Sequence, residues 1–261
     1  MRANHPPQLR KSLHCRLRFA IILYLSFQAV LMITGFDSIV IGVPDLQAAA
    51  RELGAVTGEL ALTADTARLD LANISLELRL DAQLTQAKII GLTMLDDSLS
   101  ASTAPQSLDA GITRGLCLER VAAANKAEPA GATSTGLTAV DHVVLQTGDA
   151  DACIELFGEQ GLGLRLALDQ HKPEWGGRMV FFRCGKLTLE IIQNDKAPAS
   201  TDHFWGITFI SQDLEHTLEA LDSAGASHSE LRAGRKPGTR VATVKSHCLG
   251  LPTLLLEHPA A

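Results

Sequence analysis

Cysteine is scarce in this sequence and is not arranged for a metal or for a disulfide framework. The 261 residues include five cysteines, which are scattered, odd in number and never spaced as a CxxC pair. Scattered thiols are typical of a reducing compartment, and a structural zinc site needs closely spaced cysteines. We therefore expect a cytoplasmic protein with free thiols and no structural zinc.

Positive charge is also scarce once the first residues are set aside. The formal net charge is −6, but residues 1–31 carry five basic side chains and no acidic one. The remaining chain has 18 basic against 29 acidic side chains, a balance of −11. Because such a surface repels phosphate backbones, we expect no nucleic-acid partner. Apolar residues make up 46% of the chain, enough to build a core.

The longest apolar run lies near the N-terminus, at residues 19–36 (FAIILYLSFQAVLMITGF). Its length suits a membrane helix or a signal peptide. However, Ser26 and Gln28 dilute it, no small-x-small cleavage site follows, and it leads directly into the first expected strand. We predict that residues 1–31 are an extension and that Met32 is the natural start. A membrane anchor and a secretion signal remain the alternatives.

One pattern of elements occurs twice. Residues 36–46 (FDSIVIGVPDL) align without a gap on residues 140–150 (VDHVVLQTGDA), with Ser38 in the place of His142. Each stretch is followed by an apolar stripe at helical spacing and then by three short runs typical of strands. The sequence therefore predicts a unit of one strand, one helix and three further strands in each half.

A further match marks a second unit in each half, since residues 91–99 (GLTMLDDSL) align on residues 206–214 (GITFISQDL). The earlier of these units is short, and Pro105 interrupts its expected helix. The small residues of 122–136 are typical of a linker. We predict an α+β fold with four βαβββ-type modules, the second degenerate, paired as residues 32–121 and 137–261.

Three stretches of the second half resemble the vicinal oxygen chelate superfamily, which includes glyoxalase I, bleomycin-resistance proteins and extradiol dioxygenases. They are VDHVVL (140–145), KLTLEII (186–192) and WGITFISQDLEHTLEALDSAG (205–225). The resemblance covers roughly 36–260 and is weaker in the first half. It implies that each pair of modules curls into a cup-shaped half-barrel, with a divalent metal on the floor. The metal's ligands come from first and last strands, whose alternate residues face the cup.

Carried over residue by residue, the resemblance places His142 at the first-strand ligand position and Glu190 at the last-strand position. In the fourth module the same positions fall on Gly206 and Leu254, which offer no donor atom. Catalytic metals usually have three protein ligands, and the two-His-one-carboxylate set of extradiol dioxygenases is missing. We expect His142 and Glu190 to be the catalytic pair. They bind Zn, Ni, Mn or Fe weakly at most, and no tightly bound metal is the favoured expectation.

Six further side chains are assigned to substrate binding: Trp175, Arg178, Phe182, Trp205, Arg235 and Arg240. The loop 171–178 (HKPEWGGR) is longer than its counterpart in the first module and suits a lid or a pocket wall. The basic loop 232–240 (RAGRKPGTR) is suited to a carboxylate or phosphate. Ordinary core packing and solvated surface remain the alternatives for these residues.

The resemblance implies a small-molecule ligand and a glyoxalase-like enzyme of lyase or isomerase type, acting on a small oxygenated or thiol-conjugated metabolite. The alternative is a non-catalytic binding protein, as in the drug-sequestering bleomycin-resistance members. The incomplete ligand set favours this alternative more than the resemblance does. A homodimer stays open.

Overall fold

The computed structural model describes residues 31–259. The predicted extension therefore lies almost entirely outside the described residues, as do most of the apolar run and the question of an anchor or signal. The end of that run forms part of the first strand, β1 (Ile33–Val43). Within residues 31–259, no helix combines the length and apolar character needed to cross a membrane.

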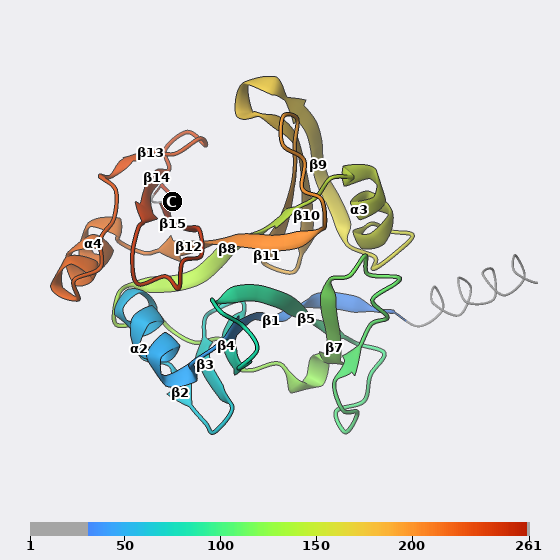
Figure 1. The fold of residues 1–261 in the computed structure, drawn as a ribbon, viewed down its shortest axis with the longest axis horizontal. Coiled ribbons are helices and arrows are strands. Elements are labelled where there is room, and N and C mark those ends of the chain that lie inside the picture. Colours follow the sequence, from blue (N-terminus) through green and yellow to red (C-terminus); the bar gives the residue numbers. More distant parts are fainter. Residues whose placement is uncertain (1–30, 260–261) are drawn as a thin grey trace, which may run out of the picture.

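The first sheet has seven strands in the order β2-β3-β4-β1-β5-β7-β6 (Figure 1). At its centre β1 pairs antiparallel with β5, while β4 is parallel to β1 and β7 is parallel to β5. The bounds of the other strands are β2 (Ala61–Leu62), β3 (Thr66–Asp70), β4 (Ser75–Leu80), β5 (Lys88–Asp96), β6 (Gln106–Ser107) and β7 (Cys117–Ala122).

The second sheet has eight strands in the order β13-β14-β15-β12-β8-β11-β10-β9. It repeats the plan of the first, with β8 antiparallel to β12, β11 parallel to β8 and β15 parallel to β12. Its strands are β8 (Leu137–Gln146), β9 (Arg165–Lys172), β10 (Gly177–Cys184), β11 (Leu187–Asn194), β12 (His203–Ser211), β13 (Arg232–Ala233), β14 (Arg240–Val244) and β15 (Thr253–Glu257).

Three of the four modules have the predicted helix: α2 (Leu46–Thr57), α3 (Ala150–Phe157) and α4 (Leu214–Ser223). The second module has none between β5 and β6, as expected for the unit that contains Pro105. The α+β class and the paired half-barrel modules are thus confirmed. Two short 3₁₀ helices, Ala123–Asn125 and Pro173–Trp175, lie in the expected linker and in the β9–β10 loop.

Each α-helix begins with the same device, an aspartate at the N-cap. The carboxylates of Asp45, Asp149 and Asp213 accept hydrogen bonds from backbone amides three residues later, at 2.9, 3.0 and 3.0 Å. Such caps satisfy amides that have no partner within the helix and stabilise a helix by about 1 kcal/mol each. The aspartates that align in the sequence therefore have one structural role.

The two sheets lie one above the other (Figure 1). One apolar core contains buried residues of both sheets. In β8, Val143 and Leu145 belong to this core, so the alternate residues of that strand face the opposite side of the sheet. A polar tie accompanies the packing, because the buried Asn73 side chain bonds both the amide and the carbonyl of Val140. The core thus fixes which side chains of the second sheet are presented to the cup.

Candidate functional site

The floor of the second cup is built by two neighbouring parallel strands. His142 lies on β8 and Glu190 on β11, and the backbone register pairs Glu190 with Val144, two residues beyond the histidine. The neighbours of Glu190, Leu189 and Ile191, are fully buried in the core. Alternation therefore turns the carboxyl to the same face as the imidazole.

The structure confirms that His142 faces the cup close to Glu190. Its Nε2 lies 3.2 Å from Glu190 Oε2 and 2.8 Å from the hydroxyl oxygen of Thr208 on β12. Its Nδ1 lies 2.7 Å from Asp141 Oδ2, and the other oxygen of Asp141 lies 3.3 Å from His258 Nε2. Both nitrogens of the histidine therefore have partners, so its orientation is fixed.

The two carboxyl groups beside His142 have opposite electrostatic character. Burial alone would raise the pKa of Asp141, but its hydrogen bond with His142 and the charges of His142, Lys236 and His258 outweigh burial and lower that pKa to about 2. Burial raises the pKa of Glu190, and the positive charges nearby offset only part of this effect. Asp141 is therefore the permanent anion and Glu190 the group that can exchange a proton.

This difference assigns the hydrogens of the histidine. Because Asp141 is ionised, Nδ1–H of His142 donates to it, and this tautomer leaves Nε2 to accept the Thr208 hydroxyl proton. Glu190 is 8% exposed, and the His142 side chain is 20% exposed. The arrangement can hold and move a proton at Nε2 or at the Glu190 carboxyl.

Three members of this cluster were missed in the sequence: Asp141, Thr208 and His258. Thr208 is two residues from Gly206 and therefore faces the same side of β12. The register between β12 and β8 shifts before Gly206 and again after Thr208, so the sequence does not show that Thr208 pairs with His142. Asp141 aligns with Asp37 of the first module, a signal that was visible. His258 follows the last strand, and no pattern in the sequence places it near Asp141.

The residues present do not fit a three-ligand catalytic metal. His142 Nε2 and Glu190 Oε2 are one pair of donors, and Asp141 already engages Nδ1. Opposite them, a Cβ added at Gly206 would lie 2.6 Å from the carbonyl oxygen of Pro252, so the main chain fills the place of a ligand side chain. Leu254 offers no donor atom.

A different acidic group lies at the outer end of β15. Among residues 31–259, Asp213, Glu215 and Glu257 form the one set of three metal-ligating side chains that lie together. Arg240 occupies it, with Nη2 2.6 Å from oxygens of both glutamates. The guanidinium therefore supplies the positive charge that this cluster requires.

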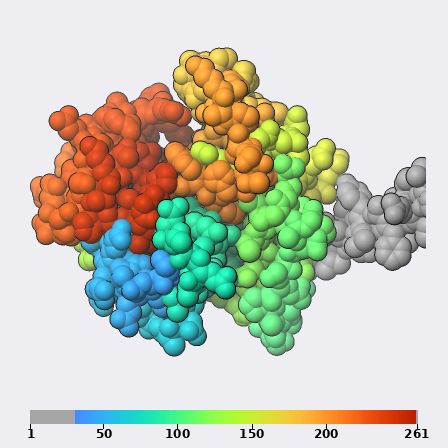
Figure 2. All heavy atoms as spheres, in the orientation of Figure 1, coloured from blue at the N-terminus to red at the C-terminus, as the bar shows by residue number. Residues whose placement is uncertain are grey.

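Two of the predicted substrate-binding residues meet at the mouth of the cup. The guanidinium of Arg235, in the β13–β14 loop, lies 4.8 Å from the centroid of the Trp175 ring, which belongs to the β9–β10 loop. Lys172 lies 5.2 Å from the same ring. Trp205 is on β12 next to Gly206 and is 42% exposed. Figure 2 shows the surface hollowed between the C-terminal segments and this part of the sheet.

The structure places the other three predicted substrate-binding residues away from the cup. Phe182 is fully buried in the core, where its ring contacts Phe157 at 6.2 Å between centroids. Arg178 is on the same face of β10 and pairs with Asp151 of α3 and with Asp169. Arg240 pairs with Glu257 on the helix side of its strands. Phe182 was assigned to the cup because its strand was recognised without its face, and Arg178 and Arg240 because each ends a loop that was expected to bind substrate.

The first sheet has a counterpart of the site in which the charges are already neutralised. Ser38 takes the place of His142, and the register pairs it with Thr93 as His142 is paired with Thr208. Glu77 takes the place of Glu190 but is bound by Arg79 at 2.6 Å. Arg68 lies 3.6 Å from the same carboxylate. This cup therefore lacks both the imidazole and a free carboxyl group.

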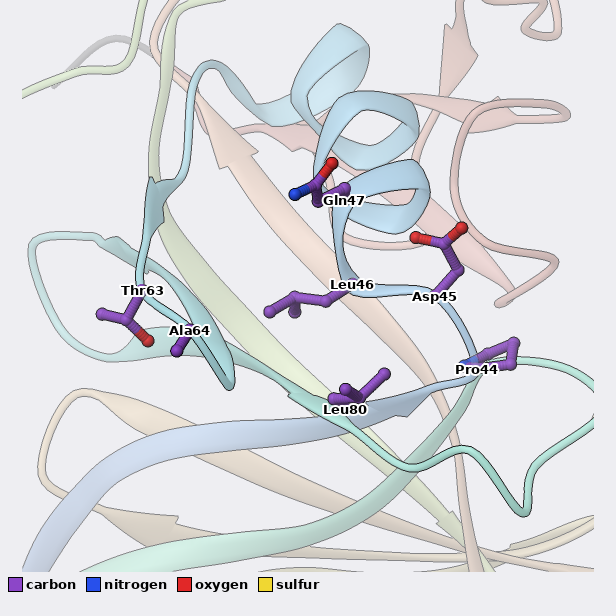
Figure 3. A pocket seen from close by; sticks show the side chains of 7 residues that line it. All are labelled: Pro44, Asp45, Leu46, Gln47, Thr63, Ala64 and Leu80. Atoms are coloured by element: carbon purple, nitrogen blue, oxygen red, sulfur yellow. The ribbon is translucent and has the colours of Figure 1, made fainter.

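Two surface hollows lie elsewhere and contain no comparable group. One, of about 380 Å³, lies beneath the start of α2, where its acidic residue, Asp45, already caps the helix (Figure 3). The other, of about 450 Å³, includes Arg114 and Asp202, which pair with each other. Neither brings a base and an acid together.

Comparison with known proteins agrees with this geometry. Residues 139–245 match the family model of the Glyoxalase/Bleomycin resistance protein/Dioxygenase superfamily. No curated protein sequence matches the chain significantly. Among solved structures, a mutant of 4-hydroxymandelate synthase from Streptomyces coelicolor is similar with a TM-score of 0.64 and 13% identity, over 88% of this chain and 94% of that one.

Two further solved structures show the same fold. The Mn(II)-bound glyoxalase from Novosphingobium aromaticivorans has a TM-score of 0.62 and 13% identity, over 88% of this chain and 84% of that one. BphC, a halotolerant catechol dioxygenase, has a TM-score of 0.57 and 12% identity, over 87% of both chains. At these identities the likeness shows the fold alone.

Proposed function

We propose, from the match of residues 139–245 to the Glyoxalase/Bleomycin resistance protein/Dioxygenase superfamily, that the second cup is a metal-independent acid–base site of lyase or isomerase type. The observation that carries the proposal is the cluster on the cup floor. It combines a buried carboxyl of raised pKa, Glu190, with a histidine held by an ionised aspartate. A paired acid and base of this kind suits proton transfer at neutral pH.

In this proposal Glu190 is the base, because burial makes its carboxylate a stronger proton acceptor than an ordinary glutamate. It takes a proton from a substrate carbon next to a carbonyl, and the electron pair of the broken C–H bond forms the enolate. The newly protonated Glu190 donates to Nε2 of His142 in place of Thr208, and the Thr208 hydroxyl is then free to donate a hydrogen bond to the enolate oxygen. Return of the proton to the opposite face of the same carbon completes an isomerisation, and loss of a leaving group from the β-carbon completes an elimination.

Asp141 acts through His142 as a positioning residue. Its contact with Nδ1 sets the tautomer, so that Nε2 is turned to Thr208 and Glu190. A metal is not needed for these steps, and we expect the purified protein to hold less than one equivalent of divalent metal. Elemental analysis after chelator-free purification checks this, and one stoichiometric equivalent of metal would overturn the metal-independent proposal.

The test of the reaction class is proton exchange. The full-length protein is incubated in D2O with small 2-oxo and 2-hydroxy carbonyl compounds, and loss of the carbon-bound proton is followed by NMR. We expect Glu190→Gln to slow exchange at least about a hundredfold, in line with the usual contribution of a general base. Asp195→Asn alters an exposed aspartate–histidine pair and is the matched control. Exchange by Glu190→Gln at the wild-type rate would reject the proposal.

The second candidate is a non-catalytic binding protein. It is favoured by Gly206 and Leu254, which leave both ligand positions of the opposite module without a side chain that can bind a metal. If compounds from the same panel bind while no carbon-bound proton exchanges, binding without catalysis is the function that the site supports.

A further inference from the structure

We propose that the substrate of the second cup is a small organic anion, whose carboxylate or phosphate is bound by Arg235 and Lys236 at the mouth, above His142 and Glu190. This inference rests on the proposed function for the position of the reacting carbon. It adds the class of substrate and the residues that select it.

The first observation is that both cations lack a carboxylate partner. Among residues 31–259, no ion pair includes Arg235 or Lys236. Neither side chain has a carboxylate oxygen within 4.0 Å of its nitrogen atoms. The chain has a net charge of −6, so acidic partners are plentiful elsewhere on it. By contrast, Arg178 and Arg240 are each held by two carboxylates.

The second observation is that the loop carrying these cations has a fixed shape. The amide of Thr239 donates to the carbonyl of Lys236 at 3.1 Å, closing a four-residue turn. Pro237 and Gly238 are its central residues, and Gly238 has φ of +79°. Proline followed by a residue of positive φ is typical of a type II turn, which is favoured by this pair. The amide of Gly234 donates to the carbonyl of Thr239 at 2.8 Å and closes the base of the loop.

The third observation is that an aromatic side chain holds the guanidinium in place. The Trp175 ring receives Arg235 at 4.8 Å and Lys172 at 5.2 Å, and it comes from the loop on the other side of the cup. Cation–π contacts at exposed sites contribute about 0.5–1 kcal/mol, enough to position a side chain. Trp175 is thus a positioning residue for the anion site.

The cations lie near enough to the cup floor for their charges to act on its carboxyl groups. The charges of Arg235 and Lys236 both oppose the effect of burial on the pKa of Glu190, and Lys236 also acts on Asp141. In this proposal the anionic group of the substrate is bound by these cations, and its reacting carbon faces His142 and Glu190. Arg235 offers two parallel donors to an oxyanion, and Lys236 adds a point charge.

The experiment is a ligand-observed NMR titration of the full-length protein at constant ionic strength. The probes are pyruvate, its uncharged methyl ester and inorganic phosphate. The variant is the double change Arg235→Gln and Lys236→Gln, and the control is Lys245→Gln, which removes a positive charge from an exposed lysine on another loop. Trp175→Leu and Trp175→Phe test the positioning role.

We expect an anionic probe to bind at least about tenfold more tightly than the ester, and the double variant to lose at least about tenfold in affinity. Trp175→Leu weakens anion binding, and Trp175→Phe restores part of it because a phenyl ring keeps the cation–π contact. Tighter binding of pyruvate identifies a carboxylate as the preferred group, and tighter binding of phosphate identifies a phosphate.

The inference is overturned if no anionic probe binds better than the ester, or if the double variant binds as well as Lys245→Gln. These outcomes are separate from the fate of the proposed function. When pyruvate binds through Arg235 and Lys236 but its methyl protons do not exchange in D2O, the anion site stands and the catalytic proposal loses support. When a neutral carbonyl compound exchanges its carbon-bound proton but no anion binds, the catalytic proposal stands and the anion site is rejected.

Discussion

The contact between Asp141 and His142 gives a stability prediction with a definite sign and pH window. The Asp141 side chain is 16% exposed, and its pKa falls from the ordinary 3.8 to about 2. Each pKa unit corresponds to about 1.4 kcal/mol, so Asp141→Asn should lower the free energy of unfolding at pH 7 by roughly 2 kcal/mol. Most of that energy comes from the Nδ1 hydrogen bond and the neighbouring positive charges, which outweigh burial.

The sign follows from the direction of the shift. A carboxyl with a lowered folded-state pKa stabilises the fold fully above its unfolded pKa of about 3.8, and this stabilisation is lost as the pH falls through about 2. The difference between wild type and Asp141→Asn should therefore be constant from pH 7 to about pH 5 and shrink below it. Urea unfolding followed by circular dichroism across this range measures it.

The chain offers a matched control in an exposed pair of the same type. His171 Nε2 lies 3.0 Å from Asp195, and the two side chains are 55% and 41% exposed. Solvent screens such a pair, so Asp195→Asn should change stability by less than about 0.5 kcal/mol. If Asp141→Asn costs no more than Asp195→Asn, or if its cost does not depend on pH below 5, the assigned role of Asp141 is wrong.

Three other substitutions test the cup. Glu190→Gln should leave stability unchanged at low pH, where the buried carboxyl is protonated, and should stabilise the protein increasingly as the pH rises through its raised pKa; thermal unfolding at pH 4 and pH 8 compares the two. Gly206→Ala puts a Cβ 2.6 Å from a main-chain carbonyl oxygen and should cost about 1–3 kcal/mol in urea unfolding, whereas Gly131→Ala, with no atom within 4 Å, should cost little. Phe182→Ala should cost about 3–5 kcal/mol of stability and leave the preference for anionic probes unchanged; a changed preference would contradict the placement of Phe182 in the core. Phe181 is half-buried on the cup face, so Phe181→Ala should cost less stability and change that preference.

The fold could be predicted because the information is local and repeated. The strand patterns and the aspartates that cap α2, α3 and α4 recur at equivalent positions. His142 and Glu190 could be paired because both lie on recognisable strands, Glu190 between buried Leu189 and Ile191 and His142 next to buried Val143. Alternation alone then sends both side chains to one face.

The rest of the site depends on register and on partners distant in sequence. The pairing of β12 with β8 shifts between Phe204 and Gly206 and again after Thr208, and such shifts cannot be inferred from periodicity. A change of one residue turns a side chain to the other face, which is how Phe182 came to be assigned to the cup. Arg178 and Arg240 were assigned as free cations because the carboxylates that bind them come from other elements.

The two cups lack the ligands of the second module of each pair in the same way. In both sheets a glycine stands where the second module of the pair would supply a ligand, and in both a main-chain carbonyl group lies against it. A Cβ at Gly91 would lie 2.2 Å from the carbonyl oxygen of Cys117, as one at Gly206 would lie 2.6 Å from that of Pro252. The loss of the opposing ligands is therefore built into the backbone of each half-barrel.

The two cups differ in the ion-pair partners of the remaining carboxylate, Glu77 in the first and Glu190 in the second. In the first, Arg79 and Arg68 bind Glu77, and a buried serine hydroxyl stands in the position of the histidine. In the second, Glu190 has no arginine or lysine within ion-pair distance among the described residues, so burial raises its pKa, and the nearest cations lie in the β13–β14 loop. A carboxyl kept from its own counter-ion, beneath two cations without carboxylate partners, is arranged for a ligand that brings its own negative charge.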